Sequence, residues 1–401
     1  MKPNPKYITL NVNSKKAYIR KSSIKNLGMV DAVIFDCDGV LIDIRGSYNR
    51  AIVEAVTYIF ESLTGYKMPE NLISDEIIFL FRRSGGFNND WDTVYGILMF
   101  LLCELPEDIQ GRLKEAAKAF LHEENAVKRL LMIKEGIGVE SNKLGLDFMK
   151  NLAVRLKDFT SQLDITGVAS VDKALLASGK VPKEFYVLMR NFLQGSGEIG
   201  ESIIATVVEE MFCGPKLFED MYGIKPAIYN GQGMIENGKP ILKRETLKRL
   251  SSLLGGKKLG IASGSKFKSA KHVLQDLLAL FNPEALVFLD RVNEAEKEYA
   301  EKGLNINLKK PNPFSLFEAA KALEPFRFIL YVGDSMEDAI MVDKARKIDQ
   351  RFLFAGVYEH TGVKEESLKE FLKYGCDLIL PSVNEIPVVI ESIRGGIVEG
   401  S

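Results

Sequence analysis

The stretch VDAVIFDCDGVLID, from Val30 to Asp43, decides the fold class of this chain. Its first part, VDAVIF, is rich in β-branched and apolar residues, as expected of a strand that is buried on both faces. The strand pattern stops at three acids, Asp36, Asp38 and Asp43. Because side chains alternate along an extended chain, Asp36 and Asp38 point to the same side and can share one reaction centre, whereas Cys37 points the other way.

Strand patterns followed by helix patterns return in the C-terminal half of the chain. They are KKLGIASGS (257–265) with KFKSAKHVLQDLLALF (266–281), ALVFLD (285–290), RFILYVGD (327–334) with SMEDAIMVDKARK (335–347), FLFAGV (352–357), and CDLILP (376–381) with VNEIPVVIESI (383–393). Repeated β-α units of this kind imply a mostly parallel sheet that is covered by helices. The sequence therefore predicts an α/β fold.

The segment between the first motif and these units carries almost only helical patterns. It begins with RGSYNRAIVEAVTYIFESLTG, which has apolar residues at helical spacing and a plausible stop at Gly65. Its longest apolar run, VYGILMFLLC from Val94 to Cys103, is too short for a membrane span and reads as a buried helix. We predict a core made from residues 26–48 and 239–401, an all-helical cap at 49–238, and an N-terminal arm or edge hairpin at 1–25.

The composition limits the classes of partner. The 401 residues include 53 Lys and Arg against 54 Asp and Glu, so the formal net charge is -1. This balance leaves no global basic field to hold nucleic acid or an anionic membrane, and we expect a small phosphorylated metabolite as the partner. The four cysteines are widely scattered, which favours a reducing compartment, and the N-terminus lacks a signal-like apolar region. We expect a cytoplasmic protein.

Ligands of parallel α/β sheets bind beyond the carboxyl ends of the strands, so the polar residues that follow each strand are the candidates for a site. They are Asp36, Asp38 and Asp43 after VDAVIF, Ser263 and Gly264 after KLGIA, and Gly333, Asp334, Ser335 and Asp338 after FILYV. Two close carboxylates repel each other, and a divalent cation relieves this repulsion. Mg²⁺ suits a site of oxygen ligands that is completed by a substrate phosphate.

Three further features suit a phosphate. Gly39 allows a sharp turn after the strand and leaves backbone N–H groups free to face a phosphate oxygen. Ser263 and Gly264 can add a hydroxyl and an amide donor. A lysine is needed to neutralise charge on the transferring phosphoryl group, and Lys310, in the loop LKKPNP, is the natural candidate.

These motifs together resemble those of the haloacid dehalogenase-like hydrolase superfamily. DxDGVLxD, a strand ending in Ser-Gly, Lys-Pro and GDSxxD occur in the family's order and cover the whole predicted core. The resemblance implies a modified Rossmann core of three layers, with a cap inserted after the first motif, and an aspartyl-phosphate intermediate. DIRGSYNRAI and GGFNNDWD further resemble a poorly characterised archaeal and cyanobacterial phosphatase-like subfamily, some of whose members are joined to histidine-biosynthesis enzymes.

The resemblance also implies a role for each residue of the motifs. Asp36 is expected to be the nucleophile, and Asp38 the acid that protonates the leaving alcohol and then deprotonates water. Ser263 and Lys310 are expected to bind phosphate, although Lys309 is adjacent and the assignment could shift by one residue.

The metal ligands implied by the resemblance come from the first and last motifs. Asp334 is expected to bind Mg²⁺ with Asp36 and the carbonyl of Asp38. Asp338 is expected to support the metal directly or through water. Asp338 could instead only improve the electrostatics at the start of the helix that follows Asp334.

Polar and aromatic residues near the start of the cap could contact a substrate. The candidates are Arg45, Tyr48, Asn88, Asn89 and Trp91, together with Arg82 and Phe87. For Arg82 a solvated helix face is the more probable role, and the glycine and asparagine residues of GGFNND also suit a plain turn.

Hydrolysis of a small phosphate monoester is the leading functional hypothesis, with the cap excluding bulk water. A phosphomutase shares the first motif and is an alternative. A dehalogenase is disfavoured because halide displacement does not require the acid/base group that Asp38 supplies. A catalytically idle binding module that uses the cap as a partner surface is a third reading, against which the complete set of acids argues.

Overall fold

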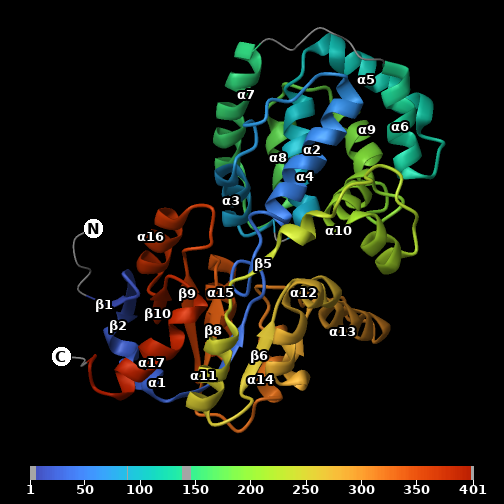
Figure 1. Cartoon of the computed structure of the whole chain (residues 1–401). Helices are drawn as coiled ribbons and strands as arrows, with labels where there is room; N and C mark the ends of the chain where they lie inside the picture. Colours follow the sequence, from blue (N-terminus) through green and yellow to red (C-terminus); the bar gives the residue numbers. More distant parts are fainter. Residues whose placement is uncertain (1–5, 88, 138–145, 399–401) are drawn as a thin grey trace. The chain divides into compact units, whose positions relative to one another are not determined.

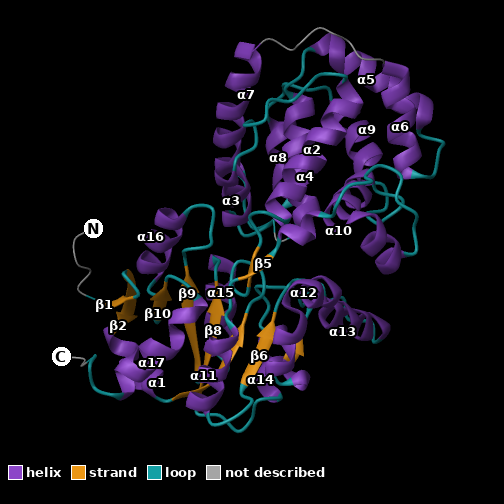
Figure 2. Cartoon of the chain, viewed as in Figure 1, coloured by secondary structure: helices purple, strands orange, loops and turns teal. Residues whose placement is uncertain are grey.

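The computed structural model describes residues 6–87, 89–137 and 146–398, and the chain divides into two compact units (Figure 1). The first unit combines Met1–Ile44 with Gly238–Ser401, and the second is Arg45–Asn237. Figure 2 shows the strands gathered in the first unit, whereas the second is built from helices.

The centre of the first unit is an eight-stranded sheet in the order β1-β2-β10-β9-β8-β3-β6-β7. Its strands are β1 (Tyr7–Val12), β2 (Lys15–Arg20), β10 (Leu378–Leu380), β9 (Phe352–Val357), β8 (Phe328–Gly333), β3 (Val30–Phe35), β6 (Leu259–Ala262) and β7 (Leu286–Val287). All neighbours from β10 to β7 are parallel. The predicted α/β fold with a mostly parallel sheet is confirmed.

The N-terminal residues form one edge of this sheet. β1 and β2 pair as an antiparallel hairpin, and β2 also pairs antiparallel with β10. The hairpin thus extends the sheet of the first unit. A separate small ladder joins β4 (Ile42–Asp43) to β5 (Lys239–Pro240), where the chain leaves the first unit and returns to it.

The described part of the first unit also contains helices. They are α1 (Ile24–Gly28), α11 (Arg244–Leu254), α12 (Phe267–Leu274), α13 (Leu289–Glu301), α14 (Phe314–Lys321), α15 (Met336–Arg346), α16 (Lys364–Tyr374) and α17 (Ile386–Arg394). α1 and α11 both pack against α17, while α14 packs against α15. Sheet and helix groups together form a Rossmann-like layered core.

β3 lies between β6 and β8, so both of its edges are paired within the sheet. Its residues from Ala32 to Phe35 are fully buried, and burial of each large apolar side chain contributes roughly 1.5–3 kcal/mol. Ala32 and Ile34 belong to the hydrophobic cluster that also contains Leu316 of α14 and Met341 of α15. Since strand side chains alternate, Asp36 continues the face of Ala32 and Ile34 just beyond the end of the strand.

Two of the predicted elements are shorter than expected. The run ALVFLD was predicted as a strand, but only Leu286–Val287 pair with β6, and α13 begins at Leu289. The predicted helix over 266–281 ends as α12 at Leu274, because Gln275 takes a left-handed φ of 48° and a 3₁₀ segment follows. Both differences concern the margin of the sheet beside β6.

The second unit is helical. It contains α2 (Tyr48–Thr64), α3 (Asp75–Arg83), α4 (Asp90–Cys103), α5 (Glu107–Phe120), α6 (Ala126–Ile137), α7 (Leu146–Phe159), α8 (Val168–Ala177), α9 (Lys183–Gln194) and α10 (Ile203–Tyr222). α2 stops at Gly65 in the left-handed conformation, as predicted. The apolar run from Val94 to Cys103 is a buried part of α4, also as predicted.

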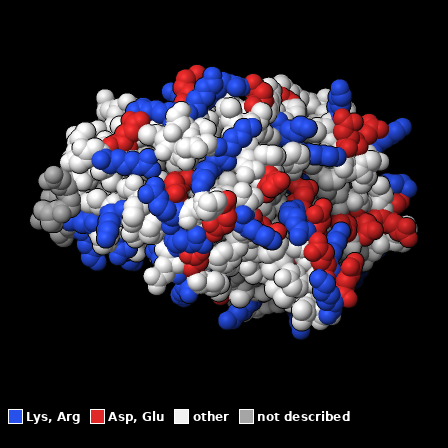
Figure 3. All heavy atoms as spheres, turned by 90° about the horizontal axis from the view of Figure 1, so that it is seen from below, with Lys and Arg blue, Asp and Glu red and all other residues white. Residues whose placement is uncertain are grey.

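Charged side chains are mixed over the surface seen in Figure 3, where basic and acidic groups lie interspersed. This distribution agrees with the formal net charge of -1. Among the helices within the described ranges, none combines the length and the apolarity that crossing a bilayer requires.

Candidate active site

Asp36 lies directly beyond the carboxyl end of β3. Its N–H donates to the carbonyl oxygen of Val332 in β8 at 2.8 Å, so the sheet ladder fixes its backbone. Its carboxylate Oδ1 accepts from the N–H of Cys37 at 2.8 Å and lies 3.0 Å from Nζ of Lys310. Asp36 is therefore a buried carboxylate that two donors orient.

Lys310 contacts residues from two neighbouring strands, Asp36 after β3 and Tyr331 in β8. Its Nζ lies 2.8 Å from Oδ1 of Asp338 and donates to the hydroxyl of Tyr331 at 2.7 Å. The hydroxyl of Tyr331 in turn lies 2.9 Å from the carbonyl oxygen of Ala262 and 3.1 Å from Asp338. The sequence left open which of two lysines enters the site, and the structure places Lys310 there while Lys309 is exposed.

Asp338 is fully buried in the first turn of α15. It forms a capping box with Ser335, because its N–H donates to Oγ of Ser335 while its own Oδ2 accepts from the N–H and the hydroxyl of Ser335. A side chain on Gly333 would meet Cβ of Asp338 at 2.5 Å, so the close approach requires glycine. Asp338 thus caps α15 and also pairs with Lys310.

The turn after Asp38 is tight, with Gly39 in the left-handed region. The N–H of Gly39 donates to the carbonyl oxygen of Ile42 at 2.9 Å, and the N–H groups of Leu41 and Ile42 donate to the carbonyl of Cys37. These amides close the turn on itself, and a role of Gly39 in binding phosphate stays a prediction.

Glycine is needed at position 39 for a different reason. Gly39 has a φ of 72°, and a Cβ there would come within 2.0 Å of Oδ2 of Asp334. The absent side chain therefore makes room for the Asp334 carboxylate beside the turn.

The serine loop after β6 faces Asp38. The hydroxyl of Ser265 donates to Oδ2 of Asp38 at 2.6 Å, and the Oγ atoms of Ser263 and Ser265 lie 3.0 Å apart. The side chain of Ser263 also makes a hydrogen bond to Asp36. Gly264 is exposed, and a Cβ there would meet no heavy atom within 4 Å. The structure therefore brings the first and second motifs together.

Burial shapes the protonation of the site. Burial raises the pKa of Asp36, Lys310 opposes this rise, and Asp338 adds to it. Burial alone would lower the pKa of Lys310, but Asp338 and Asp36 raise it well above its usual range. Burial also raises the pKa of Glu337 to about 8. The ammonium group of Lys310 therefore acts on two carboxyl groups, Asp36 and Glu337, that burial makes harder to ionise.

The donor set fits a divalent cation. Asp36, Asp334 and Asp338 can each offer a carboxylate oxygen, and these atoms lie within 4.8 Å of one another. Their charge exceeds what Lys310 alone can neutralise. Because hard cations prefer oxygen ligands, Mg²⁺ matches both the chemistry and the charge of this cluster. The carboxylate of Asp38 lies outside the cluster and is held by Ser265.

Asp43, the last acid of the first motif, belongs to the small ladder with β5. Its Oδ2 lies 3.6 Å from Nδ1 of His360, which is in the loop after β9. Asp43 is thus not one of the three acids whose carboxylates cluster around Asp36, and it contacts the loop after β9 instead.

The cap candidates have contacts within the second unit. The ring of Tyr48 stacks on Phe212 of α10 with centroids 4.2 Å apart, and Nε1 of Trp91 donates to Glu209 of α10 at 3.1 Å. Asn89 caps α4 by accepting from the N–H of Trp91.

The other residues singled out near the start of the cap also belong to the second unit. Arg82 bonds Asn49 and Asp90, both at 2.9 Å, and Phe87 is buried against Phe81. Arg45 precedes α2, and Asn88 lies outside the described residues. Their proposed contacts with a substrate stay predictions.

The sequence analysis did not identify three residues of the site. Tyr331 reads as one more apolar residue of a buried strand, and only its hydroxyl reveals a polar role. Ser265 could have been found, because it follows Ser263 at the spacing that returns a side chain to the same side. Glu337 could also have been found, because it is an acid within the motif GDSMED, between Asp334 and Asp338.

No family model matches this chain, and no curated protein matches it. Two solved structures are similar to it. An X-ray structure of the Northeast Structural Genomics Consortium target ZR25 aligns over 91% of this chain and 99% of its own, with a TM-score of 0.59 and 19% identity. The phosphatase Tt82 from Thermococcus thioreducens aligns over 85% of this chain and 98% of its own, with a TM-score of 0.45 and 19% identity. The similarity to the first of them shows a shared fold over most of both chains.

Proposed function

We propose that this protein is a Mg²⁺-dependent phosphatase that hydrolyses a small phosphate monoester through a phosphorylated Asp36. The observation that carries the proposal is the position of Asp36 at the end of the central strand, where Lys310 and the hydroxyl of Ser263 both reach its carboxylate. A carboxylate that is held in this way can act as a nucleophile toward phosphorus, while the cation and the hydroxyl bind the phosphate oxygens.

In the first step a carboxylate oxygen of Asp36 attacks the phosphorus, and the bond from phosphorus to the leaving oxygen breaks. Asp38, in its protonated form, transfers its proton to that oxygen, so the product leaves as a neutral alcohol. The hydroxyl of Ser265 lies 2.6 Å from Oδ2 of Asp38 and orients this carboxyl group. The phosphoryl group is then bound to Asp36.

In the second step Asp38, now ionised, accepts a proton from a water molecule, and the resulting oxygen attacks the phosphorus. The bond between phosphorus and Asp36 breaks, which restores the carboxylate and releases inorganic phosphate. Lys310 keeps a positive charge beside the transferring group throughout, because Asp36 and Asp338 raise its pKa.

The residues that would hold Mg²⁺ are Asp36, Asp334 and Asp338, with the backbone carbonyl of Asp38 as an expected further ligand. When bound, the ion would supply positive charge that favours the ionised form of Asp36 and offsets the charge of the phosphate. Glu337 adds a further acid next to this set.

The experiment that tests the proposal is release of inorganic phosphate from a panel of sugar, glycolate, amino-alcohol and nucleotide monoesters with Mg²⁺. We compare the parent with Asp36→Asn, and with Asp276→Asn as a matched control, since Asp276 is an exposed carboxylate paired with Arg244 in the same unit. We expect turnover by the parent and the control, and none by Asp36→Asn.

A second readout is trapping of the intermediate. Rapid acid quench with a ³²P-labelled substrate should leave label on the parent protein and none on Asp36→Asn. Turnover that survives in Asp36→Asn would refute the nucleophile, and an absence of turnover over the whole panel in folded, Mg²⁺-loaded parent would refute the phosphatase.

A further inference from the structure

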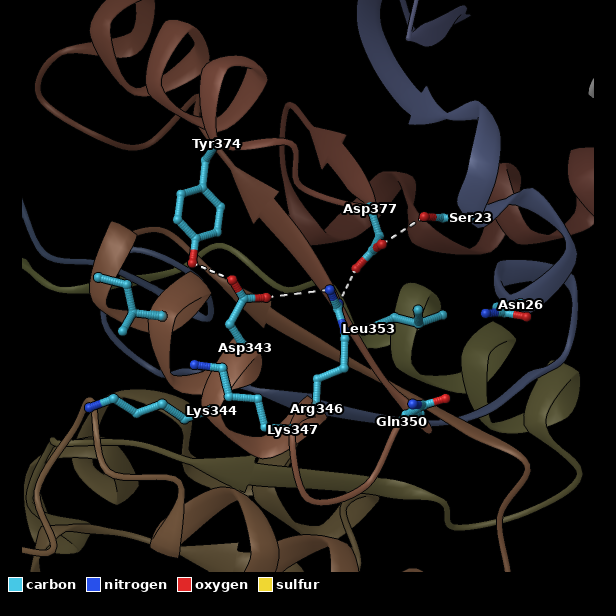
Figure 4. Close-up of a pocket in the computed structure, with 11 residues that line it drawn as sticks. Ser23, Asn26, Asp343, Lys344, Arg346, Lys347, Gln350, Leu353, Tyr374 and Asp377 are labelled. Atoms are coloured by element: carbon cyan, nitrogen blue, oxygen red, sulfur yellow. Dashed lines mark hydrogen bonds and ion pairs between the residues drawn. The ribbon is translucent and has the colours of Figure 1, made fainter.

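The first unit has an open depression of about 680 Å³ at the C-terminal end of α15 (Figure 4). It lies between the last two turns of α15, the end of α16 and the segment around α1. α15 has 11 residues and is therefore about 16 Å long, and Asp338 occupies its first turn. The depression is thus at the opposite end of α15 from the candidate active site.

Polar side chains that line the depression are joined to one another by hydrogen bonds. In Figure 4, Tyr374 donates to Asp343, Asp343 and Asp377 both accept from Arg346, and Ser23 donates to Asp377. Asp377 also accepts from the N–H of Phe354 at 3.0 Å. Arg346 offsets part of the negative charge of these two acids, and the neutral donors hold their carboxylates in place.

Two lysines add positive charge to the depression. Lys344 and Lys347 lie three residues apart at the end of α15, so both ammonium groups can reach the same space. Within the described part of the chain, neither has an ion-pair partner within 4.0 Å, and Figure 4 shows no bond to either. With Arg346, the depression holds three cations against two carboxylates, and an anion is the complementary ligand.

The other walls suit a ring. Ile340 and Tyr374 are large side chains that are 38% and 41% exposed, and both line the depression. Asn26 and Gln350 add amide groups that can donate and accept. The volume lies within the roughly 300–1,000 Å³ that is usual for small-molecule sites.

We propose that this depression is a second binding site, which takes a small organic phosphate that carries a ring. The phosphate would bind Lys344 and Lys347, and the ring would lie against Ile340 and Tyr374. The site has no part in the proposed phosphoryl transfer, so its occupancy is measured by binding and does not depend on turnover.

The test is isothermal titration in EDTA with four probes, namely AMP, glucose 6-phosphate, adenosine and inorganic phosphate. The proteins are the parent, Lys344→Gln/Lys347→Gln, and the control Lys297→Gln/Lys302→Gln. The control removes two exposed lysines near the end of α13 that do not line the depression. All three proteins keep Asp36 and Lys310, so any binding at the candidate active site is common to them.

We expect AMP, glucose 6-phosphate or both to bind the parent and the control with equal affinity, and to bind Lys344→Gln/Lys347→Gln at least about tenfold more weakly, as lost charge-assisted contacts require. Adenosine and inorganic phosphate should bind more weakly than the better organic phosphate. Equal affinity of all three proteins would overturn the proposal, as would failure of both organic phosphates to bind the parent. Inorganic phosphate that binds as tightly as the organic phosphates would overturn the role of the ring. Unchanged circular dichroism of the variants shows that lost binding is not lost folding.

Discussion

Replacing Lys310 by Met should destabilise the first unit strongly, because Lys310 is the cation between two buried carboxylates. Its Nζ lies 3.0 Å from Asp36 and 2.8 Å from Asp338, and its side chain is 9% exposed. At an effective dielectric constant near 20, each such contact is worth about 5–6 kcal/mol of attraction before desolvation is subtracted. Met retains most of the apolar stem, so the change removes mainly the charge.

Protonation of one carboxyl group limits the loss of folding stability in Lys310→Met. Without Lys310, Asp36 and Asp338 repel each other, and the folded variant can relieve this by binding one proton. For a carboxyl group with an ordinary pKa near 3.9, binding a proton at pH 7 costs about 4 kcal/mol. We therefore expect a loss of about 3–4 kcal/mol at pH 7, within the usual range for breaking a buried ion pair.

The sign of the pH dependence follows from the same proton. In the variant, the pKa of one carboxyl group in the folded state lies above its value in the unfolded state. The folded variant thus binds more protons, and its deficit is largest at neutral pH and shrinks as the pH falls toward about 4. At pH 5 the deficit should be about 1–2 kcal/mol.

The assay is urea unfolding in EDTA followed by circular dichroism at pH 7 and pH 5. Lys309→Met is the matched control, since Lys309 is adjacent and exposed, and its stability should stay close to that of the parent. If Lys310→Met loses less than about 1 kcal/mol relative to this control, or loses the same amount at both pH values, the electrostatic reasoning is wrong.

Three other changes test the site. Gly39→Ala should weaken Mg²⁺ binding, measured by titration calorimetry, because its Cβ must displace Asp334, whereas Gly264→Ala meets no atom and should bind Mg²⁺ as the parent does. Ser265→Ala should lower kcat about tenfold through loss of one hydrogen bond to the acid/base carboxyl group, and an unchanged kcat would contradict this role. Glu337→Gln should stabilise the protein in EDTA by about 3 kcal/mol at pH 7, since burial raises the pKa of Glu337 to about 8 and its ionised form is disfavoured. This gain should fall steadily as the pH drops from 7 to about 4.5 and be absent below that, and a gain that is equal at pH 4 and pH 7 would rule out the titration of Glu337 as its cause.

The strands of the site could be predicted because they obey a local rule. VDAVIF has the apolar character of a strand that is covered on both faces, and β3 spans Val30–Phe35. Parallel strands bring their carboxyl ends to one edge, so residues that follow three different strands were expected to meet. The contact of Ser263, which follows β6, with Asp36 is the outcome of that topology.

The finer geometry depends on contacts that no local pattern encodes. Gln275 breaks the helix predicted over 266–281 without a glycine or proline to announce it. The hydroxyl of Tyr331 reaches the site only because β8 is adjacent to β3 in the sheet order. The N–H of Gly39 donates to the carbonyl oxygen of Ile42, a contact that depends on how the whole turn closes.

In the helical unit, too, local patterns predict the elements but not the contacts between them. Its helices follow from apolar periodicity and stops such as Gly65, which α2 confirms. The pairing of Trp91 with Glu209 joins residues that are 118 positions apart, and it arises from the packing of α4 against α10. Spacing in the sequence contains no information on such a pair.

The charge balance of the site links the proposed metal to the proposed substrate. Asp36, Asp334 and Asp338 together face the single ammonium group of Lys310, so their ionised forms leave an excess of negative charge. A phosphate monoester brings up to two further negative charges to the same place. Because like charges within a few ångströms raise one another's pKa, this site would hold protons in place of substrate unless another cation entered. A divalent cation restores the balance and leaves Asp36 ionised for attack on phosphorus, so the proposed need for Mg²⁺ and the proposed nucleophile follow from the same arrangement of carboxylates.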